Sequence, residues 1–412
     1  MLRFLRAIGS NLRSGAWLSP ERIRAYGLIS LAGFVLYIAV LAIRLHGLSE
    51  PDGQPIGSDF SNVYAAGRMV DQGRAPQAYD WTAEHEMEKS LFGPQTPLYT
   101  WHYPPIFLGL AAALALMPYL AALFAWQAST FLLYLAAIKR IAGRPEWLIP
   151  AATYPAAIIN IGHGHNGFLT AALFGFGLAL LEKRPFVAGL LLGALSYKPQ
   201  FGLLLPLALA AGGHWRAILA AGLSVLALAA LSAGLFGPAT WRAFFDSLEP
   251  TRIVFEQGST GWHKIQSVFS AARNWGGGVA TAYVLQAIVD AIAAAAIVLV
   301  WRSHADFAYK AAALIAGALL ATPYVFDYDM MALAPALAFL AARGLRDGFA
   351  PYEASILAVV WAAPLFARLV MGATTIPLGL MAIAALLAVS TWGGLGLSHR
   401  LAQAKPARAA QA

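Results

Sequence analysis

An uncharged apolar run of 18 residues, Tyr26 to Ile43, constrains the fold of this chain more than any other feature. As an α-helix this run would be about 27 Å long, close to the hydrocarbon thickness of a lipid bilayer. Comparable runs recur along nearly the whole sequence, in which 59% of the 412 residues are hydrophobic and only 12% are charged. Soluble domains carry about twice that share of charged residues. The sequence therefore predicts an integral membrane protein.

The apolar runs predict an all-α, polytopic membrane protein with about 12 transmembrane helices. No stretch of globular composition is long enough for a separate soluble domain. We therefore expect a single transmembrane domain, residues 1–402, followed by a disordered cytoplasmic tail, residues 403–412. The run 104–118 is short and bounded by prolines, and we interpret it as a re-entrant or interfacial helix, with a full span as the alternative. The predicted spans are 26–43, 119–138, 146–161, 167–181, 186–197, 201–212, 216–236, 279–300, 308–322, 329–342, 354–370 and 376–394.

Two of these runs, 186–197 and 201–212, are each about 18 Å long as helices, which is short for crossing a full bilayer. Pro199 lies between them and cannot donate a backbone hydrogen bond, so it is a natural place for a break. We expect two short helices that meet at residues 198–200. The first span, 26–43, is not followed by a small-residue cleavage pattern, so we expect it to be retained rather than removed as a signal peptide.

The distribution of Lys and Arg residues assigns the two sides of the membrane. With the N-terminus inside, the inner segments hold 17 of the 28 Lys and Arg residues, whereas the loop 46–103 carries mainly acidic residues. Both termini are therefore predicted to be cytoplasmic, and 46–103 is predicted to be a large first extracytoplasmic loop. The net charge of +8 reflects this orientation, and we do not expect nucleic-acid binding. The absence of cysteine excludes disulfides, thiolate metal sites and thiol nucleophiles.

Polar and ionisable residues gather on the predicted outer side, at the ends of apolar helices. Such groups are costly in a membrane and usually line a cavity or mark a pathway, so the sequence predicts an extracytoplasmic site. The outer segments hold Asp59 and Arg68; His102 and Tyr103; His163, His165 and Asn166 of the GHGHNG segment; Lys198 and Gln200; Lys264 and Gln266; and Asp327 and Asp329.

Several of these residues also have a simpler interpretation. His163 and His165 are either ordinary interfacial residues or hydrogen-bond partners of polar ligand groups. Their spacing, without a matching carboxylate pattern, predicts no metal site. Lys198 either extends its ammonium group to the membrane surface or binds a phosphate. The GHGHNG segment is not a nucleotide-binding fingerprint, because no strand surrounds it.

The acidic residues have structural alternatives as well. Asp327 and Asp329 are suited to cap the start of a helix, where negative charge is favourable. Asp59 is suited to cap a helix over residues 60–71, with Ser58 competing for that position. Lys264 is equally consistent with an ordinary loop residue. The sequence alone leaves these alternatives open.

The ordered set of polar segments resembles the GT-C class of polytopic glycosyltransferases. Within that class it is similar to glycosyltransferase family 87, which includes mycobacterial polyprenol-phosphate-mannose-dependent α-1,2-mannosyltransferases. The resemblance covers most of the chain in order. The segments that carry it are SDFSNVYAAGRMVDQGRAPQAYD (58–80), WHYPPIFLGLAAALALMPYLAALFAW (101–126), GHGHNGFLTAALFGFGLAL (162–180), AGLLLGALSYKPQFGLLLPLAL (188–209) and ATPYVFDYDMMALAPAL (321–337).

The resemblance implies transfer of a hexose, with mannose expected, from a polyprenyl-phosphate donor to a hydroxyl acceptor with inversion. The acceptor would be a glycolipid or glycan on the extracytoplasmic face of a bacterial inner membrane, and no cofactor is implied. In GT-C enzymes an acidic residue in the first extracytoplasmic loop serves as the catalytic base, and Asp59 is the residue that matches. The residues themselves agree, because a donor whose tail lies in the lipid needs no nucleotide-binding motif.

The remaining polar residues receive roles that suit this reaction. The leaving lipid phosphate is an anion and needs positive charge beside it, which makes Arg68, Lys198 and Lys264 candidates. The alternatives to this function are a GT-C transferase of another sugar, such as arabinose or an aminosugar, and a lipid or polysaccharide transporter. The candidates for binding sugar or acceptor hydroxyls are Tyr103, His163, His165, Asn166, Gln200, Gln266, Asp327 and Asp329.

Overall fold

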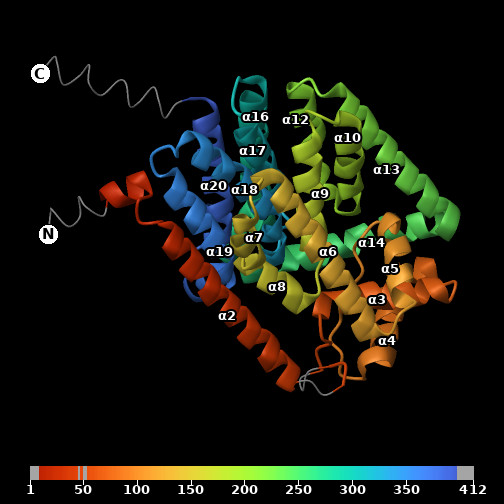
Figure 1. Ribbon diagram of the computed structural model, residues 1–412. Helices are drawn as coiled ribbons and strands as arrows, with labels where there is room; N and C mark the ends of the chain where they lie inside the picture. The colour runs from red at the N-terminus through yellow and green to blue at the C-terminus, as the bar shows by residue number, and fades with distance from the viewer. Residues whose placement is uncertain (1–8, 45–46, 50–52, 397–412) are drawn as a thin grey trace, which may run out of the picture.

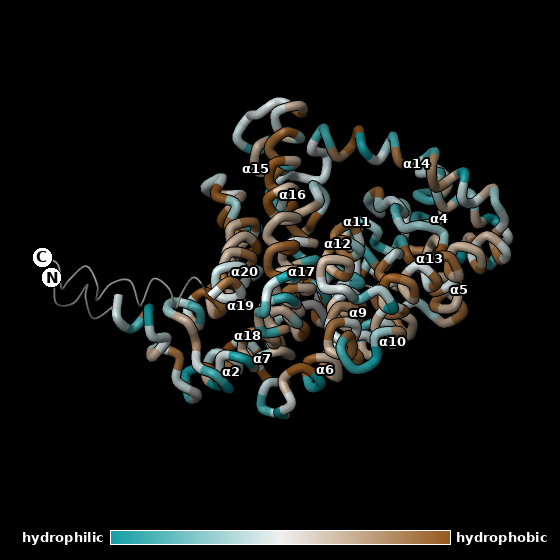
Figure 2. The backbone as a smooth tube through the Cα atoms, turned by 90° about the horizontal axis from the view of Figure 1, so that it is seen from above, coloured by the Kyte–Doolittle hydropathy of each residue, from teal (hydrophilic) through white to brown (hydrophobic). Residues whose placement is uncertain are grey.

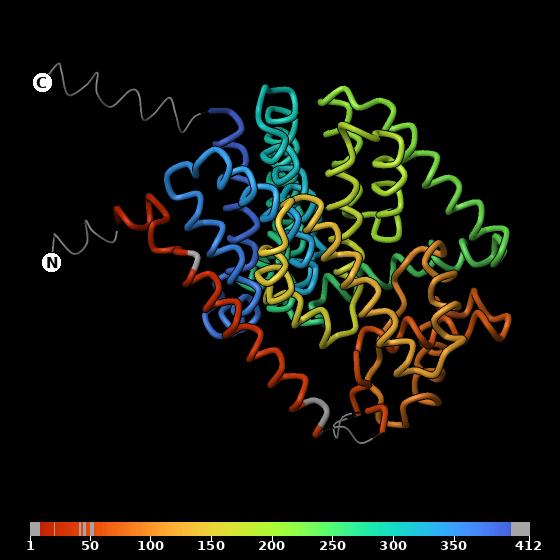
Figure 3. The backbone as a smooth tube through the Cα atoms, in the orientation of Figure 1, coloured from red at the N-terminus to blue at the C-terminus, as the bar shows by residue number. Residues whose placement is uncertain are grey.

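The computed structural model describes residues 9–44, 47–49 and 53–396, so the predicted tail 403–412 lies outside the described residues. Within the described part of the chain the regular structure is helical, apart from two isolated β-bridges (Figure 1). The predicted all-α class is confirmed. The first and last described helices both begin or end on the side of the molecule away from the lobe formed by α3 and α4 (Figure 3).

Within the residues that the structure describes, five helices are long and apolar enough to cross a membrane. Six further apolar segments are shorter than a full span. The prediction of a membrane protein is therefore supported, whereas the count of about 12 spans stays a prediction. The long helices are α2 (Pro20–Arg44), α6 (Tyr119–Ala142), α13 (Trp215–Phe236), α16 (Val279–Arg302) and α19 (Glu353–Thr374). The shorter apolar helices include α5 (Leu108–Ala115), α9 (Gly167–Leu180), α17 (Phe307–Leu320) and α20 (Leu378–Gly394). Helix α18 (Leu333–Asp347) lies between α17 and α19 in the sequence and ends in charged residues.

Prolines interrupt the helices at two places, one inside a predicted span and one between two predicted short helices. The run 146–161 forms η3 (Pro145–Trp147), α7 (Leu148–Ala152) and α8 (Pro155–His163), because Pro155 has no backbone N–H to continue the first helix. The break expected at Lys198 and Pro199 is confirmed. It separates α10 (Pro185–Ala194) and the 3₁₀ turn η4 (Leu195–Tyr197) from α11 (Pro199–Gly202) and α12 (Leu205–Ala211). The run 104–118 forms η2 (Pro105–Phe107) and α5, which together are shorter than a span.

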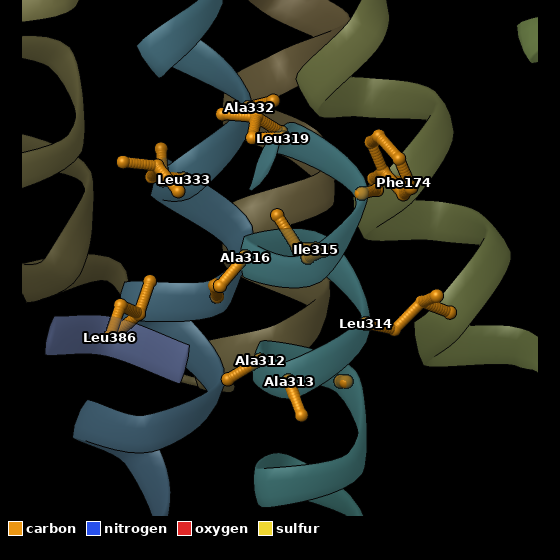
Figure 4. Close-up of a cluster of buried hydrophobic side chains, with 14 of the residues drawn as sticks. Phe174, Ala312, Ala313, Leu314, Ile315, Ala316, Leu319, Ala332, Leu333 and Leu386 are labelled. Atoms are coloured by element: carbon orange, nitrogen blue, oxygen red, sulfur yellow. The ribbon is translucent and has the colours of Figure 1, made fainter. Parts of the chain in front are cut away.

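The centre of the bundle is α17, in which every residue except Phe307 and Lys310 is buried. A helix that is apolar all round is stable only when other helices cover every face. Its Leu314 and Ile315 lie among Phe174 of α9, Leu333 of α18 and Leu386 of α20 (Figure 4). The predominance of Ala and Gly in α17 lets these neighbours approach closely, which fixes the positions of the helix ends that build the site.

A polar lobe covers one end of the bundle. It consists of α3 (Ser58–Asp71), η1 (Ala75–Tyr79) and α4 (Trp81–Phe92), and α3 packs on α5. An amphipathic helix, α14 (Pro238–Gln257), lies beside this lobe and alternates hydrophilic and hydrophobic residues along its length (Figure 2). It packs against η1, where the rings of Tyr79 and Phe244 are 5.7 Å apart. The sequence analysis did not predict α14.

Two carboxyl groups are enclosed inside the lobe. Glu84 accepts a hydrogen bond from the Trp101 backbone N–H at 3.1 Å, and Glu88 accepts one from the Ser61 hydroxyl at 3.2 Å. Both side chains are fully buried. Burial raises the pKa of Glu84 well above its usual value, with the charge of Glu88 as the second cause, and burial raises the pKa of Glu88 to about 8. The folded lobe therefore holds protons that an unfolded chain would release.

We predict that Glu84→Gln stabilises the protein at pH 8 but not at pH 4.5. A carboxyl group whose pKa is raised on folding lowers the free energy of unfolding as the pH increases. The loss begins near the pKa in the unfolded chain, 4.5, and grows up to the pKa in the folded protein, which is about 8 for Glu88. Glutamine keeps the acceptor for the Trp101 N–H and removes the titration. Thermal unfolding in detergent should show a midpoint at least about 2 °C higher for the variant at pH 8.

The exposed Glu86 of the same helix provides the matched control, and Glu86→Gln should leave the pH dependence unchanged. An increase in the midpoint of Glu84→Gln that is the same at pH 4.5 and pH 8 would show that the pair is not a buried acid pair.

Candidate active site at the junction of the lobe and the bundle

The candidate site lies where the start of α3 meets three irregular segments of the bundle. These are the junction of α8 and α9 at residues 164–166, the break at Lys198, and the 3₁₀ turn η6 (Asp327–Ala332). The turn η6 packs against both α8 and α9, and α3 packs against α8 (Figure 1). Helix ends thus place polar side chains from four distant parts of the sequence at one end of the bundle.

Asp59 lies in the first turn of α3. The N-cap of this helix is Gly57, which adopts a left-handed conformation with φ 67°, so the alternative that Asp59 caps the helix is wrong. The Asp59 carboxylate lies 3.8 Å from Nδ1 of His163, and the side chain is 22% exposed. The Ser58 hydroxyl is hydrogen-bonded to the same imidazole nitrogen at 2.9 Å. Asp59 is therefore an accessible carboxylate beside an oriented imidazole.

The electrostatic surroundings of Asp59 show that the segments converge. Burial is the largest effect and raises the pKa of the Asp59 carboxyl above its usual value, and the charge of His163 opposes this increase. Smaller effects come from Asp327, which also raises the pKa, and from Lys198 and Arg368, which lower it. A raised pKa makes the ionised form of a carboxylate a stronger proton acceptor.

The GHGHNG segment forms a polar wall of the site with Tyr103. Gly164, with φ 64°, ends α8, and Asn166 precedes α9. The Tyr103 hydroxyl accepts a hydrogen bond from Nδ2 of Asn166 at 2.7 Å and lies 3.2 Å from Nε2 of His165. The ring of His165 stacks on Tyr328 with ring centroids 3.7 Å apart. The structure thus brings together Tyr103, His165 and Asn166, as the sequence analysis expected.

A buried ion pair lies below this wall. Nζ of Lys198 donates a hydrogen bond to Asp329 at 2.6 Å, and the two side chains are 5% and 3% exposed. Asp329 also accepts a hydrogen bond from the Phe326 backbone N–H at 2.9 Å. Lys198 therefore does not extend to a membrane surface, and Asp329 combines a local backbone contact with a tertiary ion pair.

A second ion pair was missed by the sequence analysis. Arg368 of α19 donates two hydrogen bonds to the buried Asp327, from Nε at 2.7 Å and from Nη2 at 3.1 Å. The Asp327 side chain is 2% exposed and the Arg368 side chain 36%, so the arginine side chain is partly accessible. The signal was present in the sequence, since an arginine near the end of an apolar span usually marks a functional site.

The structure separates Arg68 from this cluster and places the other candidates beside the segments that form it. Arg68 is in the last turn of α3, about 13 Å along the helix from Asp59, and pairs with Asp71 at 3.9 Å. Lys264 lies in η5 (Trp262–Lys264), and Gln200 lies in α11; both are partly exposed. Gln266 is buried, and its backbone N–H donates to the carbonyl of Val325, which holds the η5 segment against the η6 segment.

The carboxylates of the cluster differ in their partners. Among the described residues, Asp327 and Asp329 each pair with an arginine or lysine side chain, whereas the partners of Asp59 are the imidazole of His163 and the hydroxyl of Ser58. The described part of the chain contains no group of three or more metal-ligating side chains, and the expectation that no metal is used stays a prediction. The arrangement can accept a proton at Asp59 and present cations and hydrogen-bonding groups around it.

We predict that Lys198→Met lowers the free energy of unfolding by about 3–5 kcal/mol, because it leaves the carboxylate of Asp329 buried without its cation. Adding Asp329→Asn removes that charge and keeps an acceptor for the Phe326 N–H, so the double variant should recover part of the loss. Denaturant unfolding in detergent measures both. A double variant less stable than Lys198→Met would contradict the coupling of the two residues.

Comparison with known proteins agrees with this geometry. Residues 101–323, a little over half of the chain, match glycosyltransferase family 87. The matched region includes the Tyr103 wall, the GHGHNG segment and Lys198. No curated protein and no solved structure gave a significant match. The chain is a membrane glycosyltransferase that belongs to glycosyltransferase family 87.

Proposed function

We propose that this protein transfers a hexose, with mannose as the expected sugar, from a polyprenyl-phosphate carrier to a hydroxyl group of a glycolipid or glycan. Asp59 acts as the general base, and the reaction takes place on the extracytoplasmic face of a bacterial inner membrane. The observation that carries the proposal is the position of Asp59. It is the one carboxylate in the described cluster without a Lys or Arg partner, and it lies beside His163 at the junction of the lobe and the bundle.

The reaction needs one proton acceptor and one site for an anionic leaving group. The ionised carboxylate of Asp59 accepts the proton of the acceptor hydroxyl. At the same time, the oxygen of that hydroxyl attacks the anomeric carbon from the face opposite the phosphate. The bond between the anomeric carbon and the phosphate oxygen breaks, and the polyprenyl phosphate leaves with the electron pair. The anomeric configuration is inverted. General-base catalysis of this kind contributes about 10²- to 10⁴-fold to the rate.

A lipid-linked donor suits the position of the site. The cluster lies at one end of a bundle of apolar helices, next to the polar lobe, so a carrier lipid can keep its chain in the bilayer while the sugar reaches Asp59. The helix ends away from the lobe carry most of the basic residues, which supports a cytoplasmic position for those ends and for both termini.

The alternatives are weaker on the same observations. Transfer of arabinose or an aminosugar would use the same base and differ only in the sugar contacts. A transporter would need polar groups from both halves of the chain near the bilayer midplane. Asp290 of α16 is the carboxylate nearest to that description, and it accepts a hydrogen bond from Gln286 of its own helix at 2.6 Å.

We predict that Asp59→Asn lowers turnover by about 10²- to 10⁴-fold while the protein remains folded, because the amide keeps the shape of the side chain and cannot accept the proton. Purified protein in detergent would be offered polyprenyl-phospho-mannose with cell-envelope lipids, and the release of polyprenyl phosphate would be measured together with the mass of the product.

Asp71→Asn is the matched control, since Asp71 is on the same helix and pairs with Arg68 away from the cluster. Its turnover should stay near that of the wild type. Equal turnover of Asp59→Asn and the wild type would refute the role of Asp59. Absence of turnover with this donor and with the other lipid-phosphate sugars would refute the transferase proposal.

We predict that turnover falls as the pH is lowered through the pKa of Asp59, because only the ionised carboxylate is a base, and that the midpoint lies above the usual aspartate value of 3.8. His163→Gln removes a charge that lowers this pKa, so its acid limb should move to higher pH. The pH profile of kcat/KM measures the shift. An acid limb that stays in place or moves to lower pH would contradict the pairing of Asp59 with His163.

A further inference from the structure

An apolar cavity of about 1050 Å³ separates α2 from the rest of the bundle. Its walls come from α2, α7, α8, α18 and α19, and they include Gly33, Ala338 and Ala358. The cavity runs beside the helix that precedes the lobe, and no catalytic step described above uses it.

Residues in the middle of helix α2 contact the bundle. A side-chain carbon at Gly27 would lie 3.2 Å from Ile149, and the Ser30 hydroxyl donates a hydrogen bond to the Thr153 carbonyl at 2.7 Å. Further along the helix, Tyr37 lies so close to Gly162 of α8 that a side chain at that glycine would collide with the tyrosine hydroxyl. A side-chain carbon at Gly33 would meet no atom within 4 Å, so the helix faces open space at this position.

The end of the cavity away from the lobe is closed by the chain that precedes α2. The Trp17 indole N–H donates a hydrogen bond to the Ser355 hydroxyl at 2.7 Å, and this hydroxyl donates to the Leu12 carbonyl at 2.7 Å. The turn before α2 is thus fixed to the start of α19. A molecule in the cavity would have its apolar end here and its other end at the lobe side.

The lobe end of the cavity leads to the candidate active site. Along α19, one stripe of residues at helical spacing lines the cavity, namely Ala354, Ala358, Trp361 and Leu365. Arg368 is the next position of that stripe. On α8, Ile158 lines the cavity. By helical spacing along α19, the apolar wall is therefore followed by the guanidinium of Arg368.

We propose that this cavity binds the isoprenoid chain of a lipid phosphate and that Arg368 binds its phosphate group. The proposal rests on the proposed function, since it names where the donor lies. An apolar cavity that ends in a guanidinium is complementary to an apolar chain that ends in an anion. Nε and Nη2 of Arg368 are held by Asp327, which fixes the orientation of the group. Its Nη1 has no protein partner among the described residues, so it remains available to a phosphate oxygen.

The other cations fit this role less well. Lys198 is buried and neutralised by Asp329, and Arg68 pairs with Asp71 at the far end of α3. Lys264 lies directly before Ile265, which forms a β-bridge with Phe326, and it does not line the cavity. Among these residues only Arg368 combines partial exposure, orientation by a buried carboxylate, and the helical position that follows the lining residues of α19.

The absence of cysteine from the chain permits a direct test. Ala358→Cys places one thiol in the cavity. Leu369→Cys is the control, since Leu369 is on the same helix and its side chain is 69% exposed. The rate of labelling by a maleimide would be measured with polyprenyl phosphate, with the corresponding polyprenol, and with phosphatidylglycerol. At a polyprenyl phosphate concentration about ten times the dissociation constant, labelling of the Ala358→Cys protein should slow about tenfold, because only the free protein reacts. The control should be unaffected.

The role of Arg368 is tested in the same assay. Adding Arg368→Gln should raise the polyprenyl phosphate concentration that gives half-maximal protection by about tenfold to hundredfold. This is the loss of affinity expected when a hydrogen bond to a charged group is removed. If that variant does not fold, Arg368→Lys and the comparison of polyprenyl phosphate with polyprenol in the wild-type background decide the question. Equal protection by polyprenol, or full protection without Arg368, would overturn the phosphate assignment.

The remaining outcomes separate this inference from the proposed function. Equal protection by phosphatidylglycerol would show a general lipid cavity and overturn the inference, and so would equal protection of the Leu369→Cys control. Turnover of a lipid-phosphate sugar without protection at Ala358→Cys would overturn the inference and leave the transferase proposal standing. Protection without turnover of any donor would retain the lipid-phosphate site and overturn the transferase proposal.

Discussion

The buried ion pair between Lys198 and Asp329 is the interaction on which the rest of the site depends. Each charge would be costly alone in the interior, and their 2.6 Å contact compensates that cost only while the α10–α11 break and the η6 turn stay together. With η6 held in place, Tyr328 stacks on His165 and Asp327 faces Arg368. One ion pair thus fixes the position of η6, and with it Tyr328 and Asp327, on the side of the site opposite Asp59.

Much of the fold could be predicted from the sequence because its signals are local. Apolar runs gave the positions of the long helices, and Pro199 gave the break that puts Lys198 at a helix end. The expectation that polar residues gather at one end of the bundle was also sound, since most of the expected residues meet there. The role of Asp59 came from the resemblance to GT-C enzymes and stays a prediction.

The rest depended on tertiary contacts that no local pattern contains. Arg368 lies in a run that reads as an ordinary span, and its partner Asp327 is 41 residues away. Arg68 was grouped with Asp59 because both are in one loop, although helical geometry places them at opposite ends of α3. Helix α14 mixes charged and apolar residues, so hydropathy alone did not separate it from a loop.

The pairing of charges explains why Asp59 is suited to be the base. The negative charge of Asp327 raises the pKa of Asp59, whereas the positive charges of Lys198 and Arg368 lower it. The cations of the two ion pairs therefore oppose the increase in the pKa of Asp59 that burial and Asp327 cause. A bound phosphate beside Arg368 would add negative charge again and strengthen the proton affinity of Asp59 only while the donor is present. The same guanidinium would then limit the repulsion, which gives the Asp327 and Arg368 pair a part in both binding and base strength.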